Sequence, residues 1–257
     1  MDLQLKGKIV LITGSGRGIG KVVANRFAQE GAHIVLNDVN AESLETSRKE
    51  LLSFPVEVLA VLGNLADEAA TASVFRQIEA KFNALDVLVN NAAILIDKLL
   101  LEMSLDEWQR ILRNNVDSVF LATREAVKLM RPERHPVIIN AGSFGGLVPA
   151  IGYSAYNASK AAIMNLTATM AGELNSRGIR VTGYIPGVVR TEMTRAMLER
   201  EPKRMVAQIP IGRLAEPEEI ANLVVFLASD VAGYINGSMV EVSGGKLCVQ
   251  NPGRYSG

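Results

Sequence analysis

The stretch that decides the fold is KIVLITGSGRGIG, residues 8–20. Its first six residues are mostly apolar and β-branched, as in a strand buried inside a sheet. Gly14, Gly18 and Gly20 then form a glycine-rich turn, which we expect to lead into a helix near Gly18. Glycines at this spacing, G-x-x-x-G-x-G, allow a tight turn and a close approach of the backbone to a phosphate. Because a helix N-terminus attracts anions, the stretch predicts a pyrophosphate site.

Short apolar runs and longer amphipathic segments alternate along the rest of the chain. Asn40, Ser104 and Pro217 provide start signals for helices. The expected strands are 8–13, 32–37, 56–61, 85–90, 136–141, 179–184 and 238–242, and the helices with start signals are 41–53, 105–130 and 217–229. This order predicts an α/β protein: a single-domain Rossmann-type fold over residues 1–257, with a doubly wound parallel sheet of about seven strands and helices on both faces.

The bulk composition is typical of a folded globular protein, with 48% apolar and 21% charged residues. The 27 Lys and Arg residues balance the 27 Asp and Glu residues, so we expect neither nucleic acid nor a membrane as a partner. The single cysteine, Cys248, excludes an internal disulfide. No segment has the length of a signal-peptide core or a membrane span, and we expect a cytoplasmic protein.

Asp38, at the end of the second expected strand, bears on the choice between NAD and NADP. A carboxylate there can accept hydrogen bonds from the adenosine ribose hydroxyls, and it would repel a 2′-phosphate, which favours NAD. Arg17 favours NADP, because a guanidinium in the glycine-rich turn can pair with a 2′-phosphate. We give Asp38 more weight, since repulsion between like charges at contact is costly whereas Arg17 can turn toward solvent.

The stretch YSAYNASK, residues 153–160, places two tyrosines and a lysine at an expected helix start. Tyr156 and Lys160 are four residues apart, so they share a helix face about 6 Å apart along the axis. Tyr153 is roughly 10 Å from Lys160 and precedes Ser154, which we expect to cap the helix. A nearby ammonium and an oxidised nicotinamide would lower the pKa of Tyr156 from its ordinary value. Tyr156, and not Tyr153, is therefore the tyrosine on which the lysine can act.

With these features the chain resembles the short-chain dehydrogenase/reductase family over essentially its whole length. Each motif is short, but their order and spacing make the match specific. The motifs that carry the resemblance are TGSGRGIG (13–20), Asp38, NNAA (90–93), RNNV (113–116), Ser143, YNASK (156–160), PGVVRTEM (186–193) and VSGG (242–245).

The resemblance implies four residues of the reaction centre. Tyr156 would be the acid/base, Lys160 would also hold the nicotinamide ribose, and Ser143 would bind the substrate oxygen. The backbone of Asn115 would hold a water that connects the lysine to solvent. Adjacent Asn114 is the alternative for this last role.

The resemblance also implies which residues contact the cofactor. Asn91 would line it, although NNAA replaces the commoner motif that ends in glycine. Asn64 and Leu65 stand where relatives often carry an aspartate that contacts adenine, and the segment after Pro186 would surround the nicotinamide carboxamide. The predicted contacts are Gly14, Ser15, Arg17, Gly18, Ile19, Gly20, Asp38, Asn64, Leu65, Asn91, Tyr156, Lys160, Pro186, Gly187, Val189 and Thr191.

The sequence therefore predicts an NAD(H)-dependent short-chain alcohol dehydrogenase or ketone reductase, which interconverts a secondary alcohol and a ketone by hydride transfer. Two alternatives stay open. One is an NADPH-dependent reductase of 3-oxoacyl thioesters of acyl carrier protein or CoA, suggested by Arg17 and by IDKLLLEMSLDEW, residues 96–108. The other is a non-catalytic, cofactor-binding subunit of a larger assembly.

Other chemistries find little support in the sequence. His33 and His135 lack partners at metal-ligand spacing, so no metal is expected. Ser143 has no evident catalytic histidine, which argues against a hydrolase triad.

The substrate is expected to be a small molecule, apolar or cyclic. We expect segment 188–212 to form a lid over it and residues 246–257 to form a C-terminal tail. Relatives commonly form tetramers, which the apolar faces of 105–130 and 154–177 suit, so a homotetramer is expected. The candidate pocket residues are Ile94, Phe144, Leu147, Ile151, Tyr153, Met193 and Met197.

Overall fold

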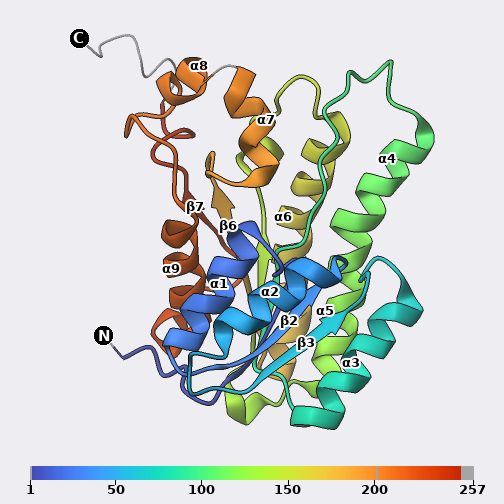
Figure 1. Ribbon diagram of the computed structural model, residues 1–257, viewed down its shortest axis with the longest axis vertical. Helices are drawn as coiled ribbons and strands as arrows, with labels where there is room; N and C mark the ends of the chain where they lie inside the picture. The colour runs from blue at the N-terminus through green and yellow to red at the C-terminus, as the bar shows by residue number, and fades with distance from the viewer. Residues whose placement is uncertain (1, 201, 250–257) are drawn as a thin grey trace.

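The computed structural model describes residues 2–200 and 202–249, and one sheet of parallel strands runs through it (Figure 1). The strands are β1 (Ile9–Thr13), β2 (His33–Asp38), β3 (Val58–Leu62), β4 (Val87–Asn90), β5 (Val137–Ala141), β6 (Arg180–Pro186) and β7 (Met239–Val242). They lie in the order β3-β2-β1-β4-β5-β6-β7. The predicted doubly wound sheet is confirmed, and every strand begins and ends within two residues of its predicted bounds.

The central strands are apolar because both of their faces are covered. β1, β4 and β5 are buried along their whole length, as continuous apolar runs predict. β1 pairs with β2 on one side and with β4 on the other, so the order of the strands reverses between β1 and β4. Ligands of doubly wound sheets bind at the carboxyl ends of the strands beside such a switch point.

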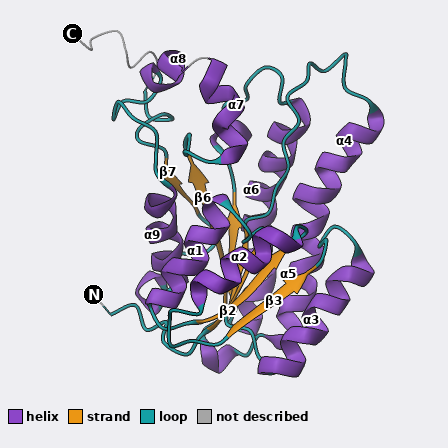
Figure 2. Ribbon diagram, viewed as in Figure 1, coloured by secondary structure: helices purple, strands orange, loops and turns teal. Residues whose placement is uncertain are grey.

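Helices cover both faces of the sheet (Figure 2). The main ones are α1 (Gly18–Gln29), α2 (Ala41–Leu51), α3 (Glu68–Phe82), α4 (Leu105–Leu112), α5 (Ser118–Leu129), α6 (Ser154–Leu174) and α9 (Pro217–Ala228). Apolar side chains of α1, α2 and α9 pack in one core layer, and those of α3, α5 and α6 pack in the other. Asn40 and Ser104 cap α2 and α4 as predicted, and Pro217 opens α9.

Two short helices lie beyond the carboxyl end of the sheet. They are α7 (Glu192–Arg200) and α8 (Pro202–Ala207), and the arrows of β6 and β7 point toward them in Figure 1. In the part of the chain that the structure describes, short 3₁₀ turns lie at Pro132–Arg134, Phe144–Gly146, Asn175–Arg177 and Asp230–Ala232. The segment predicted to be a lid therefore lies at the end of the sheet where a ligand is expected.

Two expectations about the helices are wrong in detail. Residues 105–130 do not form one helix, because a π-helical turn, Arg113–Asp117, separates α4 from α5. Such turns take one extra residue and often mark functional sites; this one carries the buried Asn115. Ser154 does not cap α6: Tyr153 leaves the helical conformation and occupies the N-cap position, so Ser154 already lies in the first turn.

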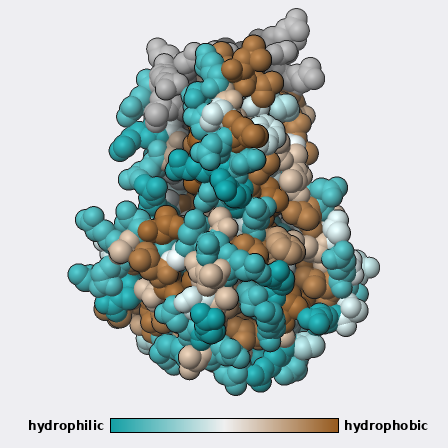
Figure 3. Space-filling model, turned by 90° about the vertical axis from the view of Figure 1, so that its right-hand side faces the viewer, coloured by the Kyte–Doolittle hydropathy of each residue, from teal (hydrophilic) through white to brown (hydrophobic). Residues whose placement is uncertain are grey.

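The side of the molecule that carries α4 mixes hydrophilic and apolar surface (Figure 3). Leu101, Leu105 and Phe120 are large apolar side chains that are 97%, 70% and 50% exposed. Scattered apolar side chains are ordinary on protein surfaces, but these three lie on or next to α4 and α5. That is one of the regions predicted to face other subunits.

Candidate active site

The glycine-rich turn after β1 packs against the residues that follow β4. Gly14 has a left-handed backbone conformation (φ 65°), and a Cβ atom there would come within 2.9 Å of the Ala92 backbone. Gly20 lets α1 pack on this turn, because a Cβ atom on it would lie 2.3 Å from the Gly14 carbonyl oxygen. Both positions require glycine, for the turn and for the close approach that the sequence predicts.

Ser15 attaches the turn to β2 and is fully buried. Its hydroxyl accepts a hydrogen bond from the Asn37 N–H (2.9 Å), and its own N–H donates to the Asn37 carbonyl (3.0 Å). The Asn37 side chain donates to two backbone carbonyls at the end of β3, and Ser47 of α2 donates to the Gly16 carbonyl (3.0 Å). Asn37 and Ser47 are not among the predicted site residues. A polar residue in the otherwise apolar strand β2 was the available signal for Asn37.

The N-terminus of α1 is suited to an anion. Arg17 holds the N-cap position without a side-chain cap, and the first turn contains no acidic residue. The N–H groups near Gly18 and Ile19, together with the positive end of the helix dipole, can therefore bind a pyrophosphate. These residues fit the dinucleotide that the glycine pattern predicts.

Asp38 lies at the end of β2 beside the same turn. One carboxylate oxygen accepts a hydrogen bond from the Gly16 N–H (2.9 Å), and the other accepts from the N–H groups of Val39 (2.8 Å) and Asn40 (3.0 Å). Three backbone donors thus hold a half-buried carboxylate in place. If the adenosine ribose binds here as predicted, this fixed negative charge would disfavour a 2′-phosphate on it.

Arg17 and Thr191 connect the turn to the predicted lid. The Arg17 guanidinium is 73% exposed and pairs with Glu192 of α7 at 2.9 Å. Thr191 lies nearby, because a Cβ atom on Gly18 would come within 3.8 Å of its methyl group. An exposed ion pair is weak, so Arg17 can exchange Glu192 for a phosphate.

Asn91 follows β4 and joins it to the glycine-rich turn. Its side-chain amide donates to the carbonyls of Thr13 (3.0 Å) and Gly14 (3.3 Å), and its backbone N–H donates to the Thr13 hydroxyl (3.0 Å). Its side-chain oxygen accepts from the hydroxyl of Tyr184 on β6 (3.3 Å). Asn91 is among the predicted cofactor contacts, whereas Tyr184 is not.

The residues predicted for proton transfer come together where β5 ends and α6 begins. Ser143 follows β5 and is buried, and its hydroxyl accepts a hydrogen bond from the Gly145 N–H (3.2 Å) and lies near the Tyr156 hydroxyl. The Lys160 ammonium lies 5.8 Å from the centre of the Tyr156 ring and donates to the Ala141 carbonyl (2.8 Å). Two hydroxyl groups therefore lie side by side, with a buried cation one helical turn away.

Burial controls the acidity of both side chains on α6. It raises the pKa of Tyr156, and the nearby Ser143 side chain offsets this effect only in part. It lowers the pKa of Lys160 to about 8. In the protein without cofactor, desolvation dominates for Tyr156. Tyr156 is then neutral at pH 7 and able to donate a proton. That Lys160 and an oxidised nicotinamide together lower the pKa of Tyr156 stays a prediction for the complex with cofactor.

Asn115 lies in the π-helical turn and is buried. Its side-chain oxygen accepts from the Ile94 N–H (2.8 Å), and its side-chain amide donates to the Ile94 carbonyl (3.0 Å) and the Ser159 hydroxyl (3.0 Å). Ser159 donates to the Tyr156 carbonyl (2.7 Å), so Asn115 is linked to the start of α6. The Asn114 side chain donates to the Arg110 carbonyl of its own helix (2.8 Å). Which of the two asparagines holds the water stays a prediction.

The remaining predicted contacts lie at the carboxyl ends of β3 and β6. Asn64 is exposed, and its side-chain oxygen accepts from the Ala66 N–H (3.0 Å), which leaves its amide N–H groups for adenine. Leu65 is buried, so only its backbone could contact a ligand there. Pro186 ends β6 and leads through Gly187 into the predicted lid.

The predicted lid is attached at both ends. A Cβ atom on Gly187 would come within 2.8 Å of the Ser243 backbone. Val189 pairs with Ala215 in an isolated parallel bridge. A small apolar cluster near these two attachments also holds the lid. Phe144, which directly follows Ser143 in the chain, packs against this cluster.

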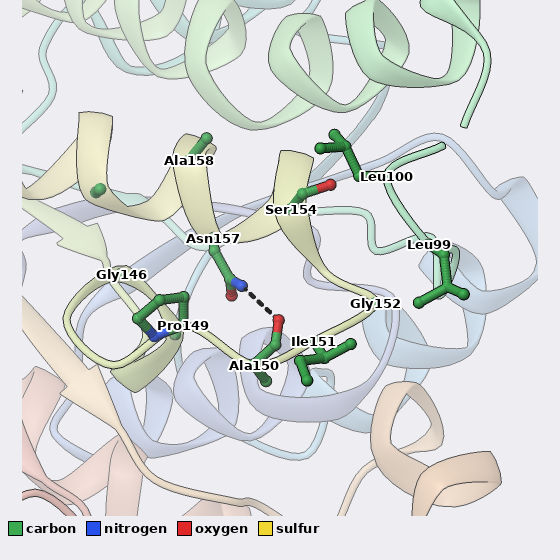
Figure 4. Close-up of a pocket in the computed structure, with 12 residues that line it drawn as sticks. Leu99, Leu100, Gly146, Pro149, Ala150, Ile151, Gly152, Ser154, Asn157 and Ala158 are labelled. Atoms are coloured by element: carbon green, nitrogen blue, oxygen red, sulfur yellow. Dashed lines mark hydrogen bonds between the residues drawn. The ribbon is translucent and has the colours of Figure 1, made fainter. Parts of the chain in front are cut away.

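A mostly apolar pocket lies between the loop after β4 and the start of α6 (Figure 4). Leu99 and Ile151 contribute to its lining, and Asn157 donates to the Ala150 carbonyl (3.0 Å) beside it. The side chains predicted for proton transfer do not line it. The predicted pocket residues are thus divided, with Ile151 here and Phe144 beneath the lid.

The other predicted pocket residues that the structure describes do not line this pocket. Tyr153 donates to a carboxylate in the loop after β4 (3.3 Å), and Leu147 and Met193 are largely exposed. The side chain of Met197 and residues 250–257 of the predicted tail lie outside the described residues.

Both histidines have structural partners. His33 accepts a hydrogen bond from the Glu57 N–H (3.0 Å), and His135 contacts the Asp230 carboxylate (3.0 Å). Within residues 2–200 and 202–249, no group of three or more His, Cys, Asp or Glu residues is placed to hold a metal ion. In the same part of the chain no helix is long and apolar enough to cross a membrane.

Comparison with known proteins agrees with this geometry. A family model described as Enoyl-(Acyl carrier protein) reductase matches residues 14–246. The chain belongs to the short-chain dehydrogenase/reductase family. It is therefore an oxidoreductase of a family that uses NAD or NADP, and the predicted family membership is confirmed.

Individual relatives cover nearly the whole chain. The 3-oxoacyl-(acyl-carrier-protein) reductase FabG of Thermotoga maritima is 37% identical over 243 residues, 95% of this chain and 99% of that protein. A short-chain type dehydrogenase/reductase from Mycobacterium marinum has a similar structure, with a TM-score of 0.91, 31% identity and coverage of 96% and 98% of the two chains. So does the L-sorbose reductase of Gluconobacter frateurii, solved with NADPH and L-sorbose, with a TM-score of 0.91, 33% identity and coverage of 97% and 100%.

Proposed function

We propose that this protein reduces 3-oxoacyl thioesters, with hydride transferred from a reduced nicotinamide to the ketone carbonyl. The observation that carries the reaction type is the placement of the Ser143 and Tyr156 hydroxyls near each other, beside the buried ammonium of Lys160. The substrate class is supported by the similarity to the T. maritima 3-oxoacyl reductase. That similarity favours the thioester over the general secondary alcohol or ketone that the sequence first suggested.

The chain's own residues act on the carbonyl oxygen. The nicotinamide supplies the hydride that reaches the carbonyl carbon. The Ser143 hydroxyl donates a hydrogen bond to the oxygen, and the Tyr156 hydroxyl donates its proton to the same oxygen as negative charge develops there. Because burial raises the pKa of Tyr156, the phenol holds its proton at neutral pH and is ready to act as the acid.

Lys160 stabilises the phenolate that remains after proton transfer. Its ammonium is one helical turn from the ring and buried, so the attraction between the two charges is weakly screened. With a pKa lowered to about 8, Lys160 can also pass a proton back to Tyr156. Asn115 holds Ser159, the neighbour of Lys160, and its predicted role in connecting the lysine to solvent is part of this proposal.

We propose NAD(H) as the preferred cofactor because of Asp38. Its carboxylate is held by three backbone donors at the position of the adenosine ribose, where it can bind the 2′-hydroxyl and repel a 2′-phosphate. The L-sorbose reductase with a similar structure was solved with NADPH. The ratio of kcat/KM for NADH and NADPH tests the preference separately from the substrate.

A second candidate is the reduction of a small ketose or polyol. The similarity to L-sorbose reductase, at 33% identity over 97% of the chain, is the observation that favours it. The two candidates differ in the ligand and share the same reaction centre. A third candidate, the non-catalytic subunit, is excluded by any turnover of the isolated chain.

A substrate panel decides among these candidates. Acetoacetyl-CoA represents the 3-oxoacyl thioesters, L-sorbose the ketoses and cyclohexanone the simple cyclic ketones, each assayed with NADH and NADPH. We expect the highest kcat/KM with acetoacetyl-CoA. A higher value with L-sorbose would replace the proposed substrate class by the second candidate, and a higher value with cyclohexanone would restore the general ketone reductase.

We also propose a homotetramer in the cytoplasm. The exposed apolar side chains Leu105 and Phe120, on α4 and α5, support an interface at these helices. Light scattering of the purified protein at micromolar concentration measures the mass, and a monomer mass would refute the tetramer.

A further inference from the structure

Tyr184 is a fully buried tyrosine that the proposed mechanism does not use. It lies near the carboxyl end of β6, and its ring packs in the core layer formed with α1 and α9. A phenylalanine would fill the same space without placing a hydroxyl in the core. Since a buried polar group needs a hydrogen-bond partner, the hydroxyl indicates a specific contact.

That contact is the Asn91 side chain. The Tyr184 hydroxyl donates to the Asn91 amide oxygen (3.3 Å), and the amide nitrogen donates to the carbonyls of Thr13 (3.0 Å) and Gly14 (3.3 Å). Both N–H bonds of the amide and its oxygen are therefore engaged. The reversed amide would place its oxygen against two carbonyl oxygens, so the observed orientation is the one the site permits.

The amide also touches the helix that would bind the pyrophosphate. A Cβ atom on Gly20 would come within 2.6 Å of the Asn91 amide nitrogen and within 2.3 Å of the Gly14 carbonyl oxygen. The Asn91 side chain thus occupies the space between the glycine-rich turn and the first turn of α1. A shift of its amide would move the Gly14 carbonyl, and with it the turn.

The Tyr184 hydroxyl is a permanent donor at working pH. Burial raises the pKa of Tyr184, and a charge on nearby Tyr156 raises it further. The group therefore keeps its proton while Tyr156 loses and regains one. Its hydrogen bond to Asn91 does not depend on the state of the reaction.

We propose that Tyr184 is a positioning residue for the dinucleotide site, which holds Asn91 and thereby the Gly14 turn in the conformation that binds the pyrophosphate. The inference rests on the family's use of NAD or NADP and is independent of the proposed thioester substrate. Tyr184 would act through Asn91 and not by contact with the reacting atoms.

The test measures the dissociation constants of NADH and NADPH for Tyr184→Phe. Fluorescence of the bound nicotinamide reports the binding, and thermal unfolding is measured in parallel. Loss of one hydrogen bond to a positioning group should weaken binding roughly 3- to 10-fold. The KM for the cofactor should rise by the same factor while kcat changes less. The ring is retained, so the variant should fold.

Thr182→Val is the matched control. Thr182 is a fully buried neighbour on the same strand, and its hydroxyl donates to the Ser238 carbonyl (2.8 Å), away from Asn91. This variant should lose stability without losing affinity for the cofactor. If Thr182→Val and Tyr184→Phe weaken binding equally, the effect is a general loosening of β6 and the proposal is wrong.

A double-mutant cycle tests the route through Asn91. In Asn91→Ala, where the amide is absent, adding Tyr184→Phe should have no further effect on cofactor affinity. Additive losses, or wild-type affinity in Tyr184→Phe alone, would overturn the proposal. Because the readout is binding of the cofactor, failure of the thioester assignment would leave these results unaffected.

Discussion

The carboxyl ends of the strands and the lid beyond them are built in different ways. In the strand-end rim, residues 13–20, 37–38, 90–91 and 140–160, polar groups such as Ser15 are buried and hydrogen-bonded to the backbone. At the base of the lid (residues 188–212), Arg190 and the adjacent Arg213 form exposed ion pairs with Glu216 and Glu219, and a small apolar cluster holds the segment. We therefore expect the rim to position the cofactor and the proton-transfer residues, and the lid to determine the substrate.

The largest effect is expected in the rim, at the proposed acid. Tyr156→Phe removes the hydroxyl and keeps the ring, so kcat for ketone reduction should fall by at least ~10²–10⁴, while NADH still binds. Steady-state kinetics and a fluorescence titration measure the two quantities. Tyr153→Phe is the matched control and should keep most of its activity, because its hydroxyl contacts Asp97. Equal losses in both variants would assign the proton transfer to another group.

The next effect concerns the carboxylate that selects the cofactor. Asp38→Ala should weaken NAD by about 1.5–3 kcal/mol, the range for a charged hydrogen-bonding partner. It should also improve NADP, because the repulsion disappears and Arg17 becomes available. Damage to the fold cannot produce opposite changes in kcat/KM for the two cofactors.

Asp38→Asn separates charge from hydrogen bonding. The amide keeps an oxygen for the backbone donors of the turn, so this variant should gain NADP activity with a smaller loss of NAD activity than Asp38→Ala. A wild-type enzyme that already prefers NADP would show that Arg17 controls the site instead.

Lys160 is expected to lower the free energy of unfolding in the pH range where its side chain is charged. Burial lowers the pKa of Lys160 from 10.5 to about 8. Below pH 8 the buried charge therefore lowers the free energy of unfolding, and this loss disappears as the pH rises toward 10.5. Lys160→Met removes the charge at every pH. The Tm of this variant relative to wild type should therefore fall between pH 7 and pH 9.5.

A lysine on the surface provides the control for this measurement. Lys128→Met removes an exposed ammonium that pairs with Glu125 (2.6 Å), and its Tm relative to wild type should not change in the same direction over this range. A pH-independent difference for Lys160→Met would show that burial of its charge does not limit stability.

The smallest effects compare one polar contact of the rim with one at the base of the lid. Ser15→Ala leaves the buried Asn37 N–H without its acceptor, which should cost about 1–3 kcal/mol of unfolding free energy. Arg213→Ala breaks an exposed ion pair with Glu219 (2.7 Å) and should cost less. Urea unfolding of both variants measures the difference. A larger loss in Arg213→Ala would contradict the contrast between rim and lid.

Much of the rim can be predicted from the sequence because its signals are local. A few neighbouring residues determine the glycine-rich turn and the spacing of Tyr156 and Lys160. The same holds outside the rim for the helix caps at Asn40 and Ser104. Asn37 and Tyr184 were missed because their partners are distant in the chain. The predicted pocket residues fall in different places for the same reason, because the sequence of a loop does not indicate which cavity or cluster its apolar side chains contact.

The sequence by itself determined the doubly wound sheet, the order of its motifs and the residue types of the dinucleotide site, since periodicity and turn chemistry act over short stretches. Only the tertiary structure decided how these groups behave. It places Lys160 against the Ala141 carbonyl, raises the pKa of Tyr156 by burial and joins Tyr184 to the Gly14 turn through Asn91. Desolvation and long-range hydrogen bonds depend on the packing of the whole sheet, and no single stretch of the chain contains them.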